Sequence, residues 1–131
     1  MLAEDDDDDT AIFREGLAEV DENVHLSIAS NGIALMALLN QAVVLPDLIF
    51  LDVNMPLKNG FQCLHEIKKN DKWKGIKIII HSTSSYPEQI NRAYNGGADL
   101  YLLKSTSYSG FKKSLEECLT CEWALLKKAA N

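Results

Sequence analysis

The sequence predicts an α/β fold: one doubly wound parallel sheet of five strands, with helices on both faces. Apolar segments of strand length alternate five times with segments of helical periodicity, the pattern of parallel strands joined by crossover helices. Residues 48–52 hold four consecutive apolar residues before Asp52, as expected for a strand buried on both faces. With 131 residues, 47% of them hydrophobic, the chain is long enough for one domain with its own core. We therefore expect residues 1–131 to form a single domain.

Composition argues against several classes of function. The formal charge of −6 disfavours nonspecific nucleic-acid binding, which requires clustered cations. No apolar stretch reaches the roughly 18 residues that a transmembrane helix needs. An Asp run follows Met1 almost at once, which is unlike a signal peptide. These features predict a cytoplasmic protein with no nucleic-acid partner and no membrane partner.

The first three residues predict a very short strand, and an acidic block follows it. Phe13, Leu17 and Val20 recur at helical spacing and predict the first helix. The later residues of the run Asp5–Asp9 begin this helix, because acidic side chains cap its amides and suit its dipole. Glu4 and the first Asp of the run are then left in the loop that leaves the strand.

Residues 24–29 alternate apolar and polar side chains and predict a second strand, on which His25 is exposed. A turn leads to a helix over residues 33–40, and the central strand, residues 48–52, follows. The next helix covers residues 60–70. Its apolar positions are Phe61, Leu64 and Ile67.

The last third of the chain continues the alternation. Residues 76–81 predict a fourth strand, followed by the hydroxyl side chains of residues 82–85. Pro87 starts a helix that ends at two glycines, and residues 99–103 predict a fifth strand before Lys104. The last helix fills the remainder of the chain. Its core candidates are Phe111, Leu115, Cys118, Leu119 and Leu126, and Trp123 can also pack.

Two of the three cysteines, Cys118 and Cys121, have the spacing of redox and zinc sites. A zinc site needs two more ligands, and the sequence holds no second such pair. A redox pair usually opens a helix, whereas this pair lies deep inside one. We therefore interpret both as buried or half-buried thiols.

In this topology the carboxyl ends of the strands converge on one edge of the sheet, where such folds place their ligands. The clustered carboxylates would repel one another and require a cation, and Mg²⁺ suits oxygen ligands of this kind. A lysine and a hydroxyl beside them would hold a phosphoryl group. The simpler alternatives are that Asp52 only caps a turn and that residues 82–85 are a plain polar loop. The side chains at this edge are Glu4, Asp5, Asp52, Ser82 and Lys104.

Taken together, these motifs resemble the receiver domain of two-component response regulators over essentially the whole chain. The resemblance rests on the Glu4–Asp5 pair, residues 51–56 with Gly60, residues 97–99 and residues 101–104. It implies a flavodoxin-like sheet of strand order 2-1-3-4-5. It also implies a binding module with only self-phosphorylation and self-dephosphorylation chemistry, and thus no enzyme.

The same resemblance assigns roles to residues and partners. Asp52 is the phosphoacceptor, Lys104 and Ser82 contact the phosphoryl group, and Ser82 with Tyr101 forms the switch. The Mg²⁺ ligands implied are Glu4, Asp5, Asp52 and the main-chain carbonyl of Asn54. The phosphoryl donor is a histidine kinase or phosphotransfer protein. A downstream protein docks on the face of the fourth helix, fifth strand and fifth helix, once Tyr101 has rotated inward.

The sequence departs from the family pattern in three places. The first strand is shorter than usual, Ser82 replaces the commoner threonine, and Ser105 replaces the proline that usually follows the lysine. Because a cis peptide without proline costs about 2.5–4 kcal/mol, we predict that the Lys104–Ser105 bond is trans.

Other functions compete with the phosphorylation switch. One is a receiver-like module that binds its partner without phosphorylation, and for Tyr101 the alternative is a plain strand aromatic. A phosphatase of similar topology needs a second Asp where Asn54 stands, and an Asp run after the first strand would repel the phosphate of a flavin.

Overall fold

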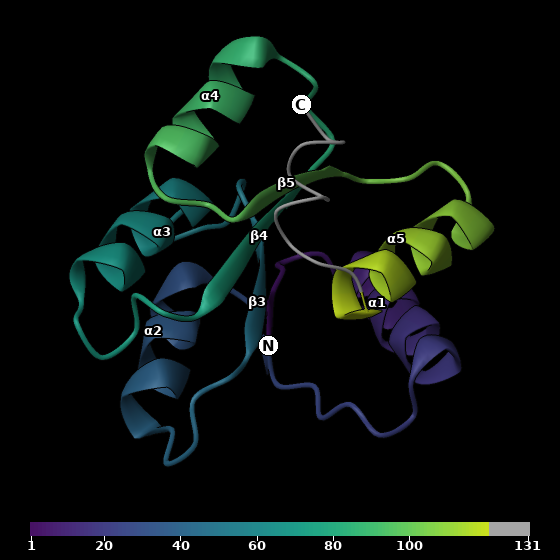
Figure 1. Cartoon of the computed structure of the whole chain (residues 1–131), viewed down its shortest axis with the longest axis horizontal. Coiled ribbons are helices and arrows are strands. Elements are labelled where there is room, and N and C mark those ends of the chain that lie inside the picture. Colours follow the sequence, from purple (N-terminus) through teal and green to yellow (C-terminus); the bar gives the residue numbers. More distant parts are fainter. Residues whose placement is uncertain (121–131) are drawn as a thin grey trace.

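The computed structural model describes residues 1–120, which form one five-stranded parallel sheet of order β2-β1-β3-β4-β5 (Figure 1). The predicted fold class and strand order are confirmed. The elements are β1 (Leu2–Ala3), α1 (Asp7–Val20), β2 (Ile28–Ala29), α2 (Gly32–Gln41), β3 (Leu48–Asp52), α3 (Gly60–Lys69), β4 (Lys77–Ser82), α4 (Pro87–Asn95), β5 (Leu100–Leu103) and α5 (Tyr108–Thr120).

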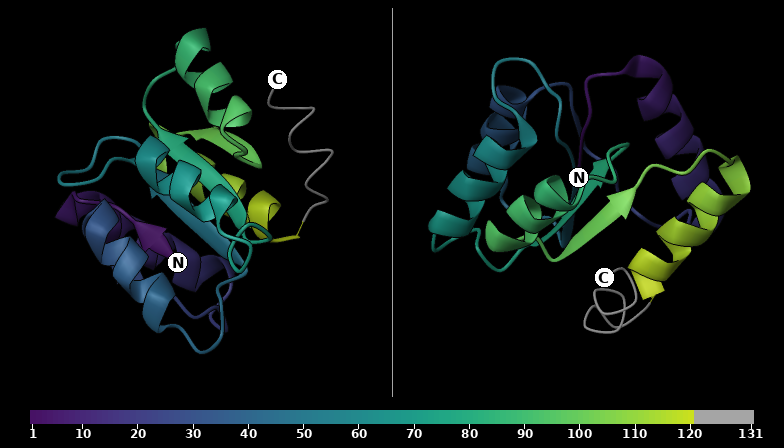
Figure 2. Two further views of the ribbon diagram at one scale, coloured as in Figure 1. Left: turned by 90° about the vertical axis from the view of Figure 1, so that its left-hand side faces the viewer. Right: turned by 90° about the horizontal axis from the view of Figure 1, so that it is seen from above.

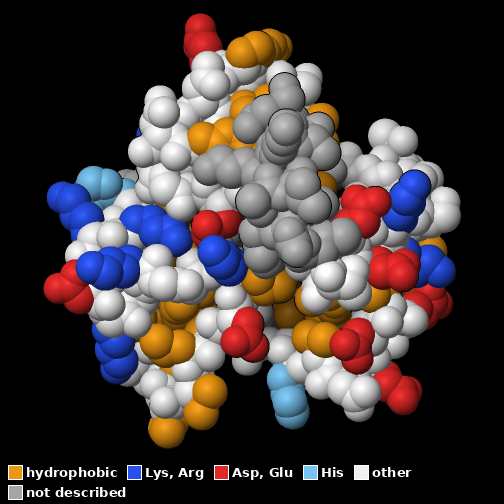
Figure 3. Space-filling view, viewed as in Figure 1, with side chains coloured by type: hydrophobic (Ala, Val, Ile, Leu, Met, Phe, Trp, Pro, Cys, Tyr) orange, Lys and Arg blue, Asp and Glu red, His pale blue; other side chains and the backbone are white. Residues whose placement is uncertain are grey.

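Helices cover both faces of the sheet, and each face has its own core. Helices α2, α3 and α4 lie on one face, and α1 and α5 pack together on the other (Figure 2). The first core includes the buried side chains of Leu35 and Leu64, and the second includes Phe13 and Leu115. On the face shown in Figure 3, Lys and Arg gather on the α3 side and carboxylates on the α1 side.

The central strands confirm the prediction of burial on both faces. Strand β3 pairs with β4 over five residues, from Leu48↔Lys77 to Asp52↔His81. In β4, residues 78–80 are three isoleucines with no exposed surface. An unbroken apolar run suits this position because both faces of the strand meet a helix layer.

The second strand is much shorter than the predicted range 24–29. Only Ile28 and Ala29 pair with β1, because β1 itself offers only Leu2 and Ala3 as partners. Residues 24–27 keep the alternating burial of a strand, and His25 is exposed as predicted. Strand pairing needs a neighbour of matching length, so the pattern alone predicted too many residues.

Other boundaries follow local chemistry. Asp6 caps α1 by accepting a hydrogen bond from the Asp9 amide, as the acidic run predicts. Asn59 and Gln62 form a capping box at the start of α3. Strand β4 is shifted by one residue from its prediction, so that Ser82 is its last residue. No peptide bond in the described range is cis, which confirms the prediction for Lys104–Ser105.

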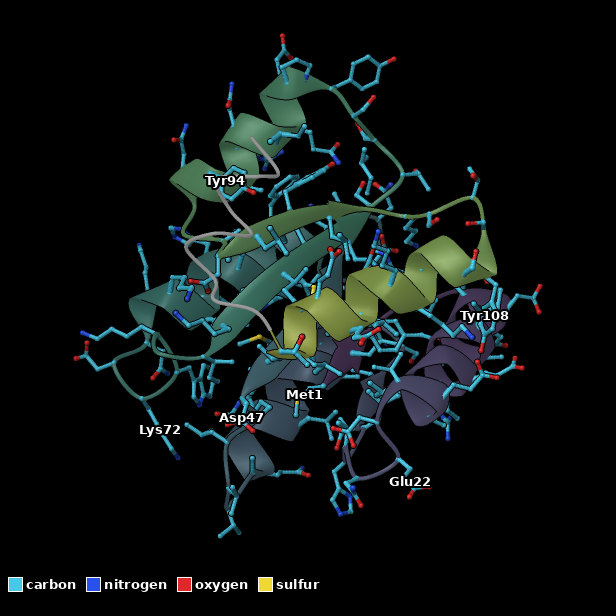
Figure 4. All side chains as sticks on the ribbon, turned by 45° about the vertical axis from the view of Figure 1, so that its right-hand side comes forward. Met1, Glu22, Asp47, Lys72, Tyr94 and Tyr108 are labelled. Atoms are coloured by element: carbon cyan, nitrogen blue, oxygen red, sulfur yellow. The ribbon has the colours of Figure 1, made fainter. Side chains whose placement is uncertain are left out.

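The amino end of the sheet carries the chain terminus. The Met1 ammonium donates to the Leu48 carbonyl at 3.0 Å, close to Asp47 (Figure 4). Cys63 and Cys118 are buried, as predicted for Cys118, whereas Cys121, Trp123 and Leu126 lie outside the described residues. Within residues 1–120, no helix combines the length and apolar content needed to cross a membrane.

Candidate metal centre

Three carboxylates meet at the carboxyl ends of β1 and β3. Oxygens of Glu4, Asp5 and Asp52 lie within 4.8 Å of one another. The Glu4 amide donates to the Ala29 carbonyl at 3.0 Å, which fixes the main chain where β1 ends. Glu4 and Asp52 are buried, and Asp5 is exposed. Parallel pairing of β1 with β3 therefore brings together residues that are 48 positions apart.

Lys104, directly after β5, supplies the positive charge of this cluster. Its Nζ lies 2.7 Å from Glu4 Oε1, 3.2 Å from Asp9 Oδ2 and 3.7 Å from Asp52 Oδ1. Burial alone would lower the pKa of Lys104, but the hydrogen bond to Glu4 and the charge of Asp52 raise it above its ordinary value. Lys104 is therefore a permanent cation, and it pairs more closely with Glu4 than with Asp52.

The Glu4 carboxyl is less acidic than an ordinary glutamate, because it is buried beside Asp52. Burial, together with the hydrogen bond and charge of Asp52, raises the pKa of the Glu4 carboxyl to about 7, although Lys104 opposes this rise. Burial and the neighbouring Asp52 carboxyl together thus outweigh the effect of Lys104 on Glu4. A divalent cation with oxygen ligands fits this donor set, because it would favour the ionised form of each carboxyl. The Asn54 carbonyl as a further ligand stays a prediction.

Ser82 lies on the neighbouring strand, at the end of β4. It is 2% exposed, and its Oγ accepts hydrogen bonds from the Ser84 amide at 3.2 Å and from Gln89 Nε2 at 3.0 Å. The Lys104 amide donates to the Ser82 carbonyl at 2.7 Å, which connects β4 to the residue that follows β5. The hydroxyl and the ammonium are thus held on adjacent strands at the same edge.

Tyr101 lies on β5 and is 5% exposed in this structure. Its inward rotation once a phosphoryl group is present stays a prediction. Its hydroxyl donates to the Ser84 carbonyl at 2.6 Å and accepts from Gln89 Nε2 at 2.8 Å. These two partners satisfy the phenol inside the protein.

Sequence reasoning missed three residues around this site. Asp9 was assigned only to the start of a helix, yet it contacts Lys104. Gln89 connects Ser82 with Tyr101, and His81 lies buried among Phe13, Phe50 and Phe111. No spacing rule points to these contacts, because each joins elements that are distant in sequence.

The response regulator receiver domain family matches residues 1–116 of this chain. The chain belongs to this family. Receiver domains are in general phosphoacceptors of two-component signalling rather than enzymes. Response regulator Rcp1 of Synechocystis sp. is 31% identical over an alignment of 121 positions, which covers 88% of this chain and 82% of Rcp1.

Solved structures agree with this assignment. The phosphorylated cyanobacterial phytochrome response regulator RcpA has a TM-score of 0.82 and 30% identity, covering 89% of this chain and 87% of RcpA. The Mn²⁺-bound form of Rcp1 has a TM-score of 0.72 and 30% identity, covering 88% of this chain and 86% of the Rcp1 chain.

A further relative in sequence is longer than this chain. Probable methanogenesis regulatory protein FilR2 of Methanothrix harundinacea is 30% identical over 73 residues, and this receiver domain spans only 47% of its length.

Proposed function

We propose that this receiver domain accepts a phosphoryl group on Asp52 from a histidine kinase or phosphotransfer protein, and that the aspartyl phosphate switches the binding of a protein partner. The observation that carries this proposal is the surroundings of Asp52. Its carboxylate lies at the end of a buried strand, with the Lys104 ammonium 3.7 Å away and two further carboxylates beside it. A turn-capping Asp needs none of these neighbours.

The transfer that we propose is a displacement at phosphorus. An Asp52 carboxylate oxygen forms the new P–O bond, the P–N bond of the donor phosphohistidine breaks, and the imidazole keeps the electron pair. Lys104 and the Ser82 hydroxyl pair with the phosphoryl oxygens, whose charge is spread in the transition state. These residues only position the phosphoryl group and neutralise its charge. Without a partner, we therefore expect only slow self-phosphorylation and self-dephosphorylation.

Mg²⁺ is the proposed metal, and Glu4, Asp5, Asp52 and the Asn54 carbonyl would hold it. When bound, it supplies charge neutralisation for the carboxylates and the phosphoryl oxygens. The Mn²⁺-bound form of Rcp1 supports a divalent cation in a relative of this chain. Carboxylate and carbonyl oxygens suit Mg²⁺ and Mn²⁺ alike, and Mg²⁺ is our proposal because the expected chemistry is phosphoryl transfer.

The proposed docking surface for the downstream partner is the face formed by α4, β5 and α5. Tyr86 and Leu103 on this side are 75% and 46% exposed, so apolar side chains are available to a partner. The cytoplasm is the proposed location, because that is where receiver domains meet the transmitter domains of their kinases.

The test uses acetyl phosphate, a small phosphodonor, with Mg²⁺ and intact-mass measurement. The parent protein and Asp47→Asn should each gain one phosphoryl group, because Asp47 is exposed at the opposite end of β3. Asp52→Asn should gain none, and chelation of the metal should prevent the gain in the parent and in Asp47→Asn. Modification of Asp52→Asn at the parental level would overturn the assignment to Asp52, whereas no gain in the parent would favour a module that binds without phosphorylation.

A further inference from the structure

The side chain of Gln89, in the first turn of α4, connects the phosphoacceptor site with Tyr101. Its Nε2 donates to Ser82 Oγ at 3.0 Å and to the Tyr101 hydroxyl at 2.8 Å. We infer that Gln89 is a positioning residue, which orients the Ser82 hydroxyl and transmits its displacement to Tyr101 and α4. The transmission rests on the proposed phosphorylation of Asp52, whereas the positioning does not.

The hydrogen bonds form a closed ring of four residues. Gln89 donates to Ser82 and Tyr101, the Tyr101 hydroxyl donates to the Ser84 carbonyl, and the Ser84 amide donates back to Ser82 Oγ. Ser82 and Tyr101 are 2% and 5% exposed, so water cannot easily replace a lost partner. A buried acceptor without a donor destabilises the protein. When one residue of the ring moves, we therefore expect the others to move so that the hydrogen bonds are kept.

The ring leaves the Ser82 proton available. An oxygen of a hydroxyl accepts about two hydrogen bonds, and both are used by the Ser84 amide and the Gln89 amide. The hydroxyl therefore remains a donor for a third partner, and a phosphoryl oxygen on Asp52 would be that partner. Only a side chain with two N–H groups can donate to Ser82 and Tyr101 together, and a primary amide has two.

The consequence of phosphorylation follows from these bonds. When Ser82 moves toward the phosphoryl oxygens, its Oγ moves away from Gln89 Nε2. Gln89 then keeps Tyr101 as its partner, and the first turn of α4 adjusts. Tyr86, the N-cap residue of α4, is 75% exposed and lies where a partner would sense this change. Tyr101 can thus stay buried throughout, and the signal is a change of hydrogen bonding rather than a rotation.

The positioning half is tested on ligand-free protein by ¹H–¹⁵N NMR. Gln89→Met keeps the length of the side chain but removes both donors, and should shift the amide signals of Ser82, Ser84 and Tyr101 together. Asn91→Met is the matched control, because it removes an exposed amide from the same helix. Far-ultraviolet circular dichroism checks that both variants are folded. Unchanged signals at Ser82 and Tyr101 in folded Gln89→Met would overturn the inference.

The transmission half adds beryllofluoride with Mg²⁺, a mimic of the phosphoryl group. In the parent and in Asn91→Met, signals near Asp52, the Gln89 side-chain amide and Tyr101 should all shift. In Gln89→Met the shifts near Asp52 should persist, while those at Tyr101 fall to less than half of the parental size. Tyr101 shifts of parental size would show another route and overturn the transmission.

Two further variants fix the order of the connection. In Tyr101→Phe the Gln89 side-chain amide should still respond to beryllofluoride, because Ser82 remains its partner. In Ser82→Ala it should not respond. The reverse pattern would contradict the order Ser82, Gln89, Tyr101. If the parent shows no shift near Asp52, the proposed function fails and transmission fails with it, while the ligand-free spectra still decide the positioning.

Discussion

The two halves of the sheet are built differently. Strand β4 pairs with β3 over five residues and with β5 over four, and the middle of β4 has no exposed side chain. Strands β1 and β2 pair over only two residues, and β1 meets β3 over two. Asp52, the proposed phosphoacceptor, belongs to the strongly paired half, whereas Glu4 and Asp5 follow the short strand. Folding should therefore depend mainly on strands β3, β4 and β5. Metal binding should be the first property lost when β1 and β2 are disturbed.

The largest effect should separate the halves directly. Leu51→Ala in β3 removes a side chain with no exposed surface and should lower the free energy of unfolding by about 2–5 kcal/mol. Leu2→Ala in β1 should cost less, because Leu2 already lines a pocket of about 270 Å³, but it should weaken Mg²⁺ binding more. Urea unfolding and Mg²⁺ titration measure the two properties. Equal losses of both in the two variants would contradict the comparison.

The free energy of unfolding should depend on pH through the buried His81. His81 lies on β4 among aromatic rings of α1 and α5, and burial followed by the charge of Lys104 lowers its pKa from 6.5 to about 4. The unfolded chain therefore binds the proton between these values, and stability is lost as the pH falls from 6.5 to 4. The contribution of His81 to this slope should reach about 1.4 kcal/mol per pH unit at its steepest. The raised pKa of Glu4 contributes with the opposite sign between about pH 4.5 and 7, so the His81 contribution is measured as the difference in slope between the parent and His81→Phe.

Urea unfolding of metal-free protein at several pH values measures this slope. His81→Phe should reduce it, while His25→Gln should leave it unchanged because that imidazole is exposed. A slope of parental size in folded His81→Phe would show that other groups cause the acid sensitivity.

Gly60 packs closely against the main chain of Asp52, the proposed phosphoacceptor. A Cβ at this position would lie 2.4 Å from the Asp52 carbonyl oxygen and 2.9 Å from Val53 Cα, so the main chain itself would have to move. Gly60→Ala should cost about 1–3 kcal/mol and slow the modification of Asp52. Gly75→Ala is the control, with nothing within 4 Å of the added atom, and should stay within about 0.5 kcal/mol. A similar loss of stability in both variants would show that the main chain at residues 52 and 53 moves without cost.

The smallest effect should be the pH dependence of Mg²⁺ binding. With the pKa of Glu4 raised to about 7, a proton competes with the cation below neutral pH. Apparent affinity should rise between pH 6 and 8 by about tenfold, since one proton is displaced. NMR shifts near Glu4, Asp5 and Asp52 during a millimolar titration report the binding. Glu4→Gln should bind more weakly and lose the dependence, and no localised shift at all would count against the site.

The sequence alone determined the central strand and the residues at the edge of the sheet. The unbroken apolar run before Asp52 predicts a strand buried on both faces, because this pattern is read from consecutive residues alone. Parallel topology then brings the ends of β1, β3, β4 and β5 to one edge, so Glu4, Ser82 and Lys104 could be grouped before any contact was known. Caps such as Asp6 are equally local.

Only the tertiary structure decided what depends on neighbours that are distant in the chain. The length of β2 is set by its pairing with β1, so alternation over residues 24–29 could not limit it. Lys104 pairs most closely with Glu4, and Tyr101 is buried because Gln89 and Ser84 offer it hydrogen bonds. Such contacts depend on angles and distances between packed elements. Spacing along the chain carries no information about them.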